Sequence, residues 1–290
     1  MLKQKSNSNS DNLGKNDQIN AKQLKQVILS SEKSLPKLVS STGEEGLYRL
    51  HFSQEILDET TGNLVERNKM SEKQAVWFEQ QIKQHFPESI VEDYESLISS
   101  MTNDFKDRHV LAAAIKCKAN IIVTYNLKDF TAESLEPWGI KAQHPDEFLL
   151  NLFSDYEMNL AVDIVAQQAA DLKKPPMTIK ELITLLEPQV PDFARLLLYY
   201  KYSPHLSYIA VKTLELMGSE KQNKILSYEE SEYSFEISNQ TLTIKQQARG
   251  EIFKQTDDTV NCNFTLEDIE KLEIFEQKLD KQHEASITKN

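Results

Sequence analysis

The hydrophobic and polar positions of residues 107–130 follow two different periods. Val110, Leu111, Ala114 and Ile115 recur at helical spacing, which predicts an amphipathic helix. The apolar run Ile121–Val123 follows after a short break and predicts a strand that is covered on both faces, as in a parallel sheet.

Two aspartates mark the ends of this predicted helix–strand unit. Asp107 stands where the helix begins, and Asp129 comes just past the carboxyl end of the strand. In open α/β sheets, ligands bind at that edge of the sheet. We therefore expect both carboxylates to point into one crevice.

Other segments carry recognisable helix and strand signals. Capping boxes predict helices that begin after Ser71 and Thr178, and the first of them is expected to bury Ala75, Trp77, Phe78 and Ile82. Further helices are expected from Pro145, over 161–172 and over 191–201. Near the C-terminus, alternating runs at 233–237 and 241–245 with Asn239–Gln240 between them predict a hairpin, 251–254 adds a possible third strand, and an amphipathic helix begins at Thr265.

The N-terminal segment leaves two interpretations open. Residues 1–20 are polar and are expected to form a disordered tail. Residues 27–29 are either a buried strand that is followed directly by Ser30, or part of an unrelated helix over 21–30.

Composition limits the possible classes of protein. A chain of 290 residues predicts one or two domains, and the net charge of −12 argues against a surface that binds nucleic acid everywhere, although a local basic groove is compatible with it. There is no long apolar run for a membrane span and no signal-peptide pattern at the N-terminus. Because only Cys117 and Cys262 are present, far apart, we expect no disulfide framework and a cytoplasmic location.

Residues 46–200 resemble the PIN domain family, the nuclease fold of the VapC-type bacterial toxins. The resemblance is carried by Gly46–Ser53, Ile56–Glu59, Asp107–Ala114, Ile122–Thr124, Asn126–Phe130, Gly139–Ile140 and His144–Leu149. It implies an α/β fold, in which a three-layer α/β/α domain with a central parallel sheet spans residues 21–153. A helical extension over 154–203 and a small C-terminal β-plus-helix module over 204–290 would follow.

The resemblance also implies a metal site and a function. Glu59, Asp107 and Asp129 would hold one or two Mg²⁺ or Mn²⁺ ions, since hard cations prefer oxygen ligands and a pair of them activates water. Thr124 and Asn126 would orient Asp129 or a metal-bound water. Arg108 or Lys128 would contact a phosphate. The implied activity is hydrolysis of RNA, with an antitoxin protein and a second copy of the chain as partners and no association with a membrane.

Each of these residues also has a simpler interpretation. Asp107 is a candidate helix cap, Asp129 a candidate turn residue, and Glu59 a candidate solvated helix residue. His109 is interpreted as a packed core histidine rather than a ligand.

One residue of the family pattern is missing. If 27–29 is the first strand, Ser30 stands where the family has its first metal-binding aspartate, and Glu32 is a substitute only if it reaches in. A hydroxyl is a poor Mg²⁺ ligand, so two hypotheses remain: a ribonuclease weakened by this loss, or a catalytically inactive PIN scaffold that serves protein interaction or regulation.

Overall fold

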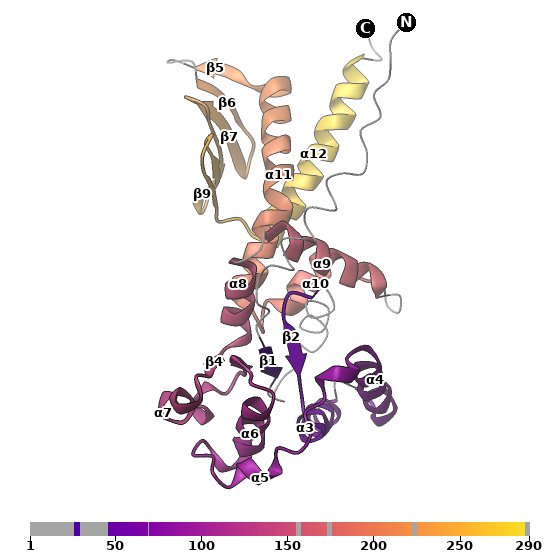
Figure 1. The fold of residues 1–290 in the computed structure, drawn as a ribbon. Helices are drawn as coiled ribbons and strands as arrows, with labels where there is room; N and C mark the ends of the chain where they lie inside the picture. Colours follow the sequence, from indigo (N-terminus) through magenta and orange to yellow (C-terminus); the bar gives the residue numbers. More distant parts are fainter. Residues whose placement is uncertain are drawn as a thin grey trace, which may run out of the picture. The chain divides into compact units, whose positions relative to one another are not determined.

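The computed structural model describes residues 26–29, 46–68, 70–154, 158–172, 176–221 and 225–287. The chain divides into two compact units, residues 1–156 and 157–290 (Figure 1). None of the described helices is both long and apolar enough to cross a membrane.

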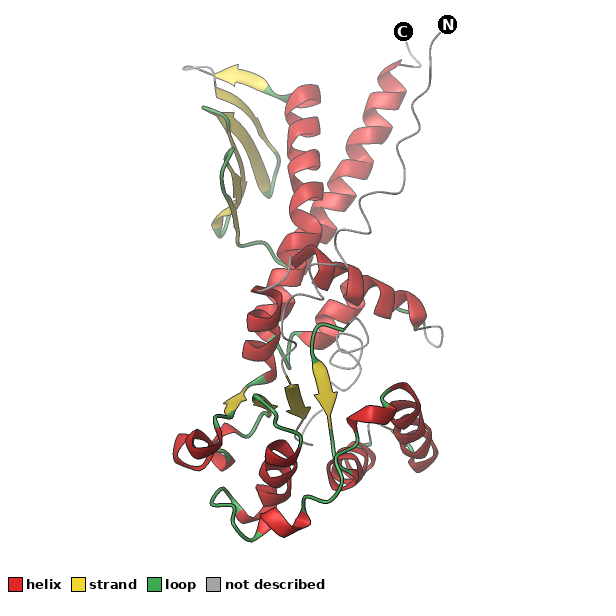
Figure 2. Cartoon of the chain, viewed as in Figure 1, coloured by secondary structure: helices red, strands yellow, loops and turns green. Residues whose placement is uncertain are grey.

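The described strands of the first unit form a four-stranded parallel sheet (Figure 2). Its order is β2 (Arg49–His51), β1 (Gln26–Leu29), β3 (Ile121–Val123) and β4 (Lys141–Gln143). Residues 26–29 are thus a strand, which decides between the two interpretations of the N-terminal segment. The α/β class with a parallel sheet is confirmed.

The strand β3 and the helix before it follow the sequence pattern closely. All three residues of β3 are buried, and the helix α6 (Arg108–Lys116) contacts both β1 and β3. Val110, Leu111 and Ala114 are fully inaccessible to solvent, which places the predicted apolar face of α6 in the core. A continuous apolar strand is typical of a parallel sheet because helices cover its faces.

The strand order places a topological switch point between β1 and β3. The chain goes from β1 to β2 on one side and returns to β3 on the other side, with Leu29 opposite Val123 at the carboxyl ends. Ligands of open parallel sheets bind in the crevice outside such a point. The segments that leave β1 and β3 therefore flank the expected binding edge.

The remaining elements of the first unit are helical. The helix α3 begins beyond the end of β2 (Figure 1), and Ser53 caps it by accepting a hydrogen bond from the Ile56 N–H. The elements are α3 (Gln54–Glu66), α4 (Glu72–His85), η1 (Pro87–Ser89), α5 (Glu95–Ile98), η2 (Phe105–Asp107), η3 (Leu127–Asp129), α7 (Ala132–Leu135), η4 (Glu136–Trp138) and α8 (Pro145–Ser154).

The predicted buried face of α4 is partly wrong. The capping box at Ser71 is present, and Ala75 and Ile82 are buried as expected. Trp77, however, is 61% exposed. At 3.6 residues per turn, a side chain two positions after Ala75 points to the opposite face of the helix, so hydrophobicity alone misplaced it.

The second unit begins with three helices, α9 (Met158–Asp171), α10 (Ile179–Leu186) and α11 (Pro191–Met217). The capping box of Thr178 with Glu181 is present at α10. The domain boundary predicted at residue 204 lies inside α11, which continues through Pro204. Leu206, Ile209 and Ala210 keep the buried face of the helix beyond the proline, and this packing outweighs the lost backbone hydrogen bond.

The second unit also contains a six-stranded antiparallel sheet. Its order is β10 (Val260–Cys262), β9 (Gly250–Gln255), β8 (Thr241–Gln246), β7 (Tyr233–Ser238), β6 (Ile225–Glu229) and β5 (Ser219–Lys221). The predicted hairpin is β7–β8, where Asn239 and Gln240 both have positive φ, as the favoured two-residue turn requires. The strands β5, β6 and β10 were missed, because they are short or lack regular alternation.

One buried carboxylate connects three elements of the second unit. Asp268, in the first turn of α12 (Leu266–Ile287), is 3% exposed. It accepts hydrogen bonds from the Thr265 N–H at 2.7 Å and the Tyr233 hydroxyl at 2.9 Å, and it forms an ion pair with Arg249. Burial raises the pKa of Asp268, but the hydrogen bonds from Arg249, Thr265 and Tyr233 outweigh this and lower it overall.

We predict that Asp268→Asn destabilises the second unit by about 1.5–3 kcal/mol at pH 7, the usual contribution of a hydrogen bond to a charged group. The measurement is denaturant unfolding followed by circular dichroism. Because the pKa of Asp268 is lowered in the folded state, this stabilisation is present above its ordinary value of 3.8 and is lost as the pH falls through the folded-state pKa. The difference between wild type and variant must therefore shrink in acid.

The matched control is Glu267→Gln, an exposed neighbour in the same turn, with an expected change within about 0.5 kcal/mol. An Asp268→Asn effect no larger than that of the control would contradict the assigned role.

Candidate metal centre

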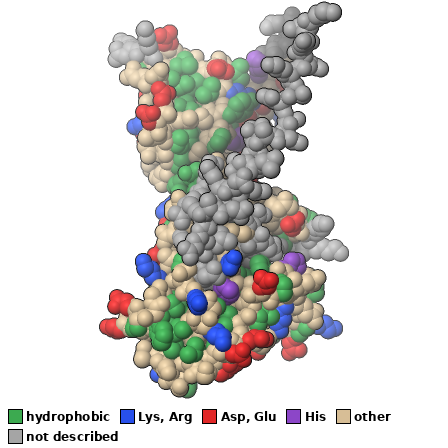
Figure 3. Space-filling view, viewed as in Figure 1, with side chains coloured by type: hydrophobic (Ala, Val, Ile, Leu, Met, Phe, Trp, Pro, Cys, Tyr) green, Lys and Arg blue, Asp and Glu red, His purple; other side chains and the backbone are tan. Residues whose placement is uncertain are grey.

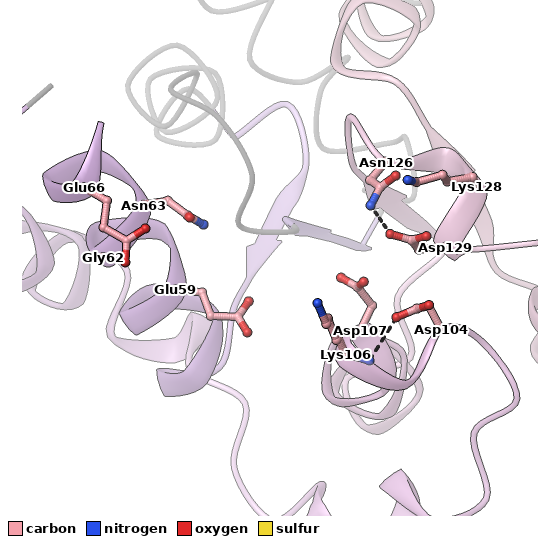
Figure 4. Close-up of a pocket in the computed structure, with 10 residues that line it drawn as sticks. All are labelled: Glu59, Gly62, Asn63, Glu66, Asp104, Lys106, Asp107, Asn126, Lys128 and Asp129. Carbon is pink, nitrogen blue, oxygen red and sulfur yellow. Dashed lines mark hydrogen bonds between the residues drawn. The ribbon is translucent and has the colours of Figure 1, made fainter. Parts of the chain in front are cut away.

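A pocket of about 590 Å³ opens in the first unit near the carboxyl end of β3 (Figure 4). It is lined by the second half of α3, the segment leading into α6, and the segment after β3. The described residues that line it are Glu59, Gly62, Asn63, Glu66, Asp104, Lys106, Asp107, Asn126, Lys128 and Asp129. The structure thus brings Glu59, Asp107, Asp129 and Asn126 together at one place, although their role as metal ligands and orienting group stays a prediction.

Asp107 stands at the N-cap position of α6. Among the described residues of that turn, however, no backbone N–H makes a capping hydrogen bond to its side chain. The simpler interpretation of Asp107 as a helix cap is therefore wrong. Figure 4 shows its carboxylate pointing into the space between α3 and the segment after β3.

Asp129 is positioned by a short polar turn after β3. The Asn126 side-chain amide donates a hydrogen bond to the Asp129 carboxylate, and the Asn126 backbone N–H donates to the Thr124 hydroxyl at 3.0 Å. Thr124 is 1% exposed and does not line the pocket, so it shapes the turn rather than reaching a ligand. The Asp104 N–H donates to the Asp129 carbonyl at 3.2 Å, which joins the segments before α6 and after β3.

The pocket is strongly acidic. Five carboxylates line it, against two lysines. Glu59 and Glu66 share one face of α3 because they lie two helical turns apart. Crowded carboxylates repel one another unless cations lie among them, and an all-oxygen donor set is the one that Mg²⁺ and Mn²⁺ prefer. The residues present therefore fit a hard divalent cation.

Asp104 and Lys106 line the pocket although the sequence pattern did not single them out. Asp104 reaches the pocket because its side chain accepts a hydrogen bond from the Lys106 N–H at 3.0 Å, which bends the chain ahead of α6. The usable signal was the Asp-x-x-Asp spacing before the helix. Of the two predicted phosphate contacts, Lys128 lines the pocket. Arg108 does not, and its guanidinium lies over the Phe105 ring at 5.5 Å and donates to the Asn103 carbonyl.

His109 is a buried residue of the first turn of α6, as predicted, with 4% exposure. Its Nε2 lies 3.5 Å from a Glu59 carboxylate oxygen, and its Nδ1 lies 3.9 Å from Glu55. Burial lowers the pKa of His109, but the Glu59 carboxylate, with Glu55 and the Lys106 carbonyl, outweighs this and raises it overall. The prediction for Ser30 and Glu32 lies outside the described residues; only the end of β1 at Leu29 is described.

Comparison with known proteins agrees with this α/β fold. Residues 19–128 match the family model described as the PIN domain, and residues 145–198 match that of the VapC50 C-terminal domain. The protein named "Putative ribonuclease VapC50" of Mycobacterium tuberculosis (strain ATCC 25618 / H37Rv) is 46% identical over 101 residues, which are 35% of this chain and 59% of that protein. No solved structure gives a significant match.

The protein is therefore an α/β protein with an acidic pocket at the carboxyl edge of a parallel sheet. Its residues 19–128 match the PIN domain family and its residues 145–198 match the VapC50 C-terminal domain, which confirms the VapC-like resemblance found in the sequence. The matched region spans less than two thirds of the length of the VapC50 relative.

We predict that Asn126→Ala weakens Mn²⁺ binding by about 10- to 100-fold, the usual cost of removing a group that orients a metal ligand. Calorimetry on the full chain measures the affinity, and Asp107→Asn, which removes a predicted ligand, should abolish binding. The control is Asn151→Ala, an exposed asparagine of α8. Wild-type protein that fails to bind at millimolar Mn²⁺ would refute the metal site altogether, and equal binding by Asn126→Ala would refute only its orienting role.

Proposed function

We propose that the first unit is a Mg²⁺- or Mn²⁺-dependent ribonuclease of the toxin–antitoxin type, weakened by the absence of an aspartate at position 30. The observation that carries the proposal is the pocket at the switch point, which collects Glu59, Asp107 and Asp129. RNA is the substrate class because the chain is VapC-like and its relative is named a ribonuclease.

The chain's own residues have distinct tasks in this proposal. Glu59, Asp107 and Asp129 hold the cation, which supplies Lewis acidity and a more acidic bound water. Asn126 keeps the Asp129 carboxylate turned toward the pocket through its amide hydrogen bond. Lys128 and Lys106 line the same pocket and neutralise the phosphate as it approaches the carboxylates.

RNA binding in this proposal is local rather than spread over the surface. On the face drawn in Figure 3, acidic and basic side chains are interspersed over the first unit and do not gather into one basic surface. With a net charge of −12, contact with phosphate has to come from a few lysines near the pocket.

Partners, location and the finer architecture are part of the same proposal. A VapC-like chain would pair with an antitoxin protein and with a second copy of itself, in the cytoplasm.

The two free thiols support the cytoplasmic location. Burial raises the pKa of the Cys117 thiol to about 11, which keeps this thiol protonated and unreactive. The contacts of α6 with β1 and β3 support one helical layer of the proposed three-layer α/β/α arrangement.

A second candidate function is that of a catalytically inactive PIN scaffold. The observation that favours it is Ser30, which follows β1 directly and supplies a hydroxyl where a carboxylate is expected. The scaffold would then serve protein contacts through its second unit, residues 157–290.

We predict slow Mn²⁺-dependent cleavage of a structured RNA by the full chain, complete loss of cleavage in Asp107→Asn, and a gain of at least about 10-fold in Ser30→Asp. The gain is expected because a restored carboxylate adds a ligand and a negative charge for the cation. The measurement is the initial rate of RNA cleavage followed by gel electrophoresis.

The matched control is Ser30→Asn, which adds a similar volume without the charge and should leave the rate near the wild-type value. Cleavage that is absent in both wild type and Ser30→Asp would overturn the enzyme proposal and favour the scaffold.

A further inference from the structure

A second group of metal-ligating side chains lies beside the pocket. Glu55 and Glu59 are one helical turn apart on α3, and His109 lies in the first turn of α6. Each of the three offers one ligand atom, and these atoms lie within 4.8 Å of one another. Ligands of a tetrahedral Zn²⁺ ion, at about 2.0–2.1 Å from the metal, are about 3.3 Å apart, so small side-chain movements close this site.

The imidazole of His109 is the observation that points to a ligand. Its Nδ1 lies 2.9 Å from the Lys106 carbonyl, which only accepts hydrogen bonds, so Nδ1 carries a proton and donates. Nε2 is buried and makes no hydrogen bond to any described residue, yet it faces a Glu59 oxygen at 3.5 Å. In the neutral ring, two lone pairs then face each other. A proton on Nε2 removes that conflict by forming an ion pair with Glu59, and a metal ion between the two atoms removes it as well.

Groups outside the cluster hold two of its members in place. The Tyr94 hydroxyl donates to Oε2 of Glu55 at 3.1 Å, while Oε1 is the oxygen nearer to His109. The Lys106 carbonyl orients the imidazole by accepting the hydrogen bond from Nδ1 of His109. Metal-binding histidines usually donate their second N–H to a carbonyl or carboxylate, which fixes the tautomer and the ring orientation.

The donor set selects the class of metal. Imidazole nitrogen suits Zn²⁺, Co²⁺ and related first-row ions, whereas Mg²⁺ prefers an all-oxygen site such as the carboxylate pocket. Two carboxylates and a neutral imidazole also balance the charge of one divalent ion. His109 supplies an imidazole nitrogen, which the described lining residues of the pocket do not offer.

We propose that Glu55, Glu59 and His109 bind a transition-metal ion of the Zn²⁺ class, at a site distinct from the pair Asp107 and Asp129. The proposal does not rest on the ribonuclease function, since it concerns binding alone. The two sites share Glu59, which also lines the pocket.

The test is a Co²⁺ titration of the full chain followed by visible absorption, with Zn²⁺ as competitor. His109→Gln and Glu55→Gln should each weaken Co²⁺ and Zn²⁺ binding by at least about 100-fold, because each removes a direct ligand and even an indirect partner costs about 10- to 100-fold. Asp129→Asn should change the affinity less than about threefold. Glu72→Gln, an exposed glutamate in the first turn of α4, is the matched control for Glu55→Gln.

Because His109 is buried, its variant is first checked for folding by circular dichroism. A measurement on wild-type protein covers the case in which the variant does not fold: Co²⁺ bound through Nε2 gives a strongly shifted, exchangeable imidazole N–H signal in the proton NMR spectrum. Absence of that signal overturns the proposal. So does equal affinity of wild type and Glu55→Gln, which would show that Glu55 is not a ligand.

The outcomes also separate this proposal from the ribonuclease. Loss of Co²⁺ binding in Asp129→Asn would place the ion in the carboxylate pocket and overturn the separate site. Retained Co²⁺ binding together with absent RNA cleavage would support the separate site while refuting the enzyme.

Discussion

The parallel pairing of β1 with β3 is the constraint on which the first unit depends. It sets Leu29 opposite Val123, so that the chain leaves both strands at the same edge of the sheet. It also creates the switch point between outward and returning connections, where ligands of open α/β sheets bind. The polar turn from Thr124 to Asp129 and the start of α6 meet at this edge, because the Asp104 N–H bonds to the Asp129 carbonyl.

Electrostatic repulsion is the cost of that arrangement. Among the described residues, five carboxylates and two lysines line the pocket, so the lysines do not neutralise the negative charge. The surrounding structure therefore fixes individual carboxylates through neutral donors: the Asn126 amide holds Asp129, and the Lys106 N–H holds Asp104. Such donors orient a carboxylate without cancelling its charge, which leaves the attraction for a cation intact.

The sequence predicted the parts of this site that are local in the chain. Asp107 and Asp129 each adjoin a helix or strand whose hydrophobic pattern is unambiguous, so their positions followed from the elements. Glu59 and Asn126 were indicated only by the resemblance to the PIN domain family. The cluster of Glu55, Glu59 and His109 could not be found in this way, since its members come from two helices separated by about fifty residues of sequence and meet only through tertiary packing. The predicted burial of Trp77 was wrong for a related reason, because hydrophobicity does not say which face of a helix a side chain occupies.

Glu59 connects the acidic pocket with the buried His109. Its carboxylate lines the acidic pocket and also lies 3.5 Å from Nε2 of His109. The proposed ribonuclease and the proposed Zn²⁺-class site would both use this carboxylate, so binding of one cation would weaken binding of the other.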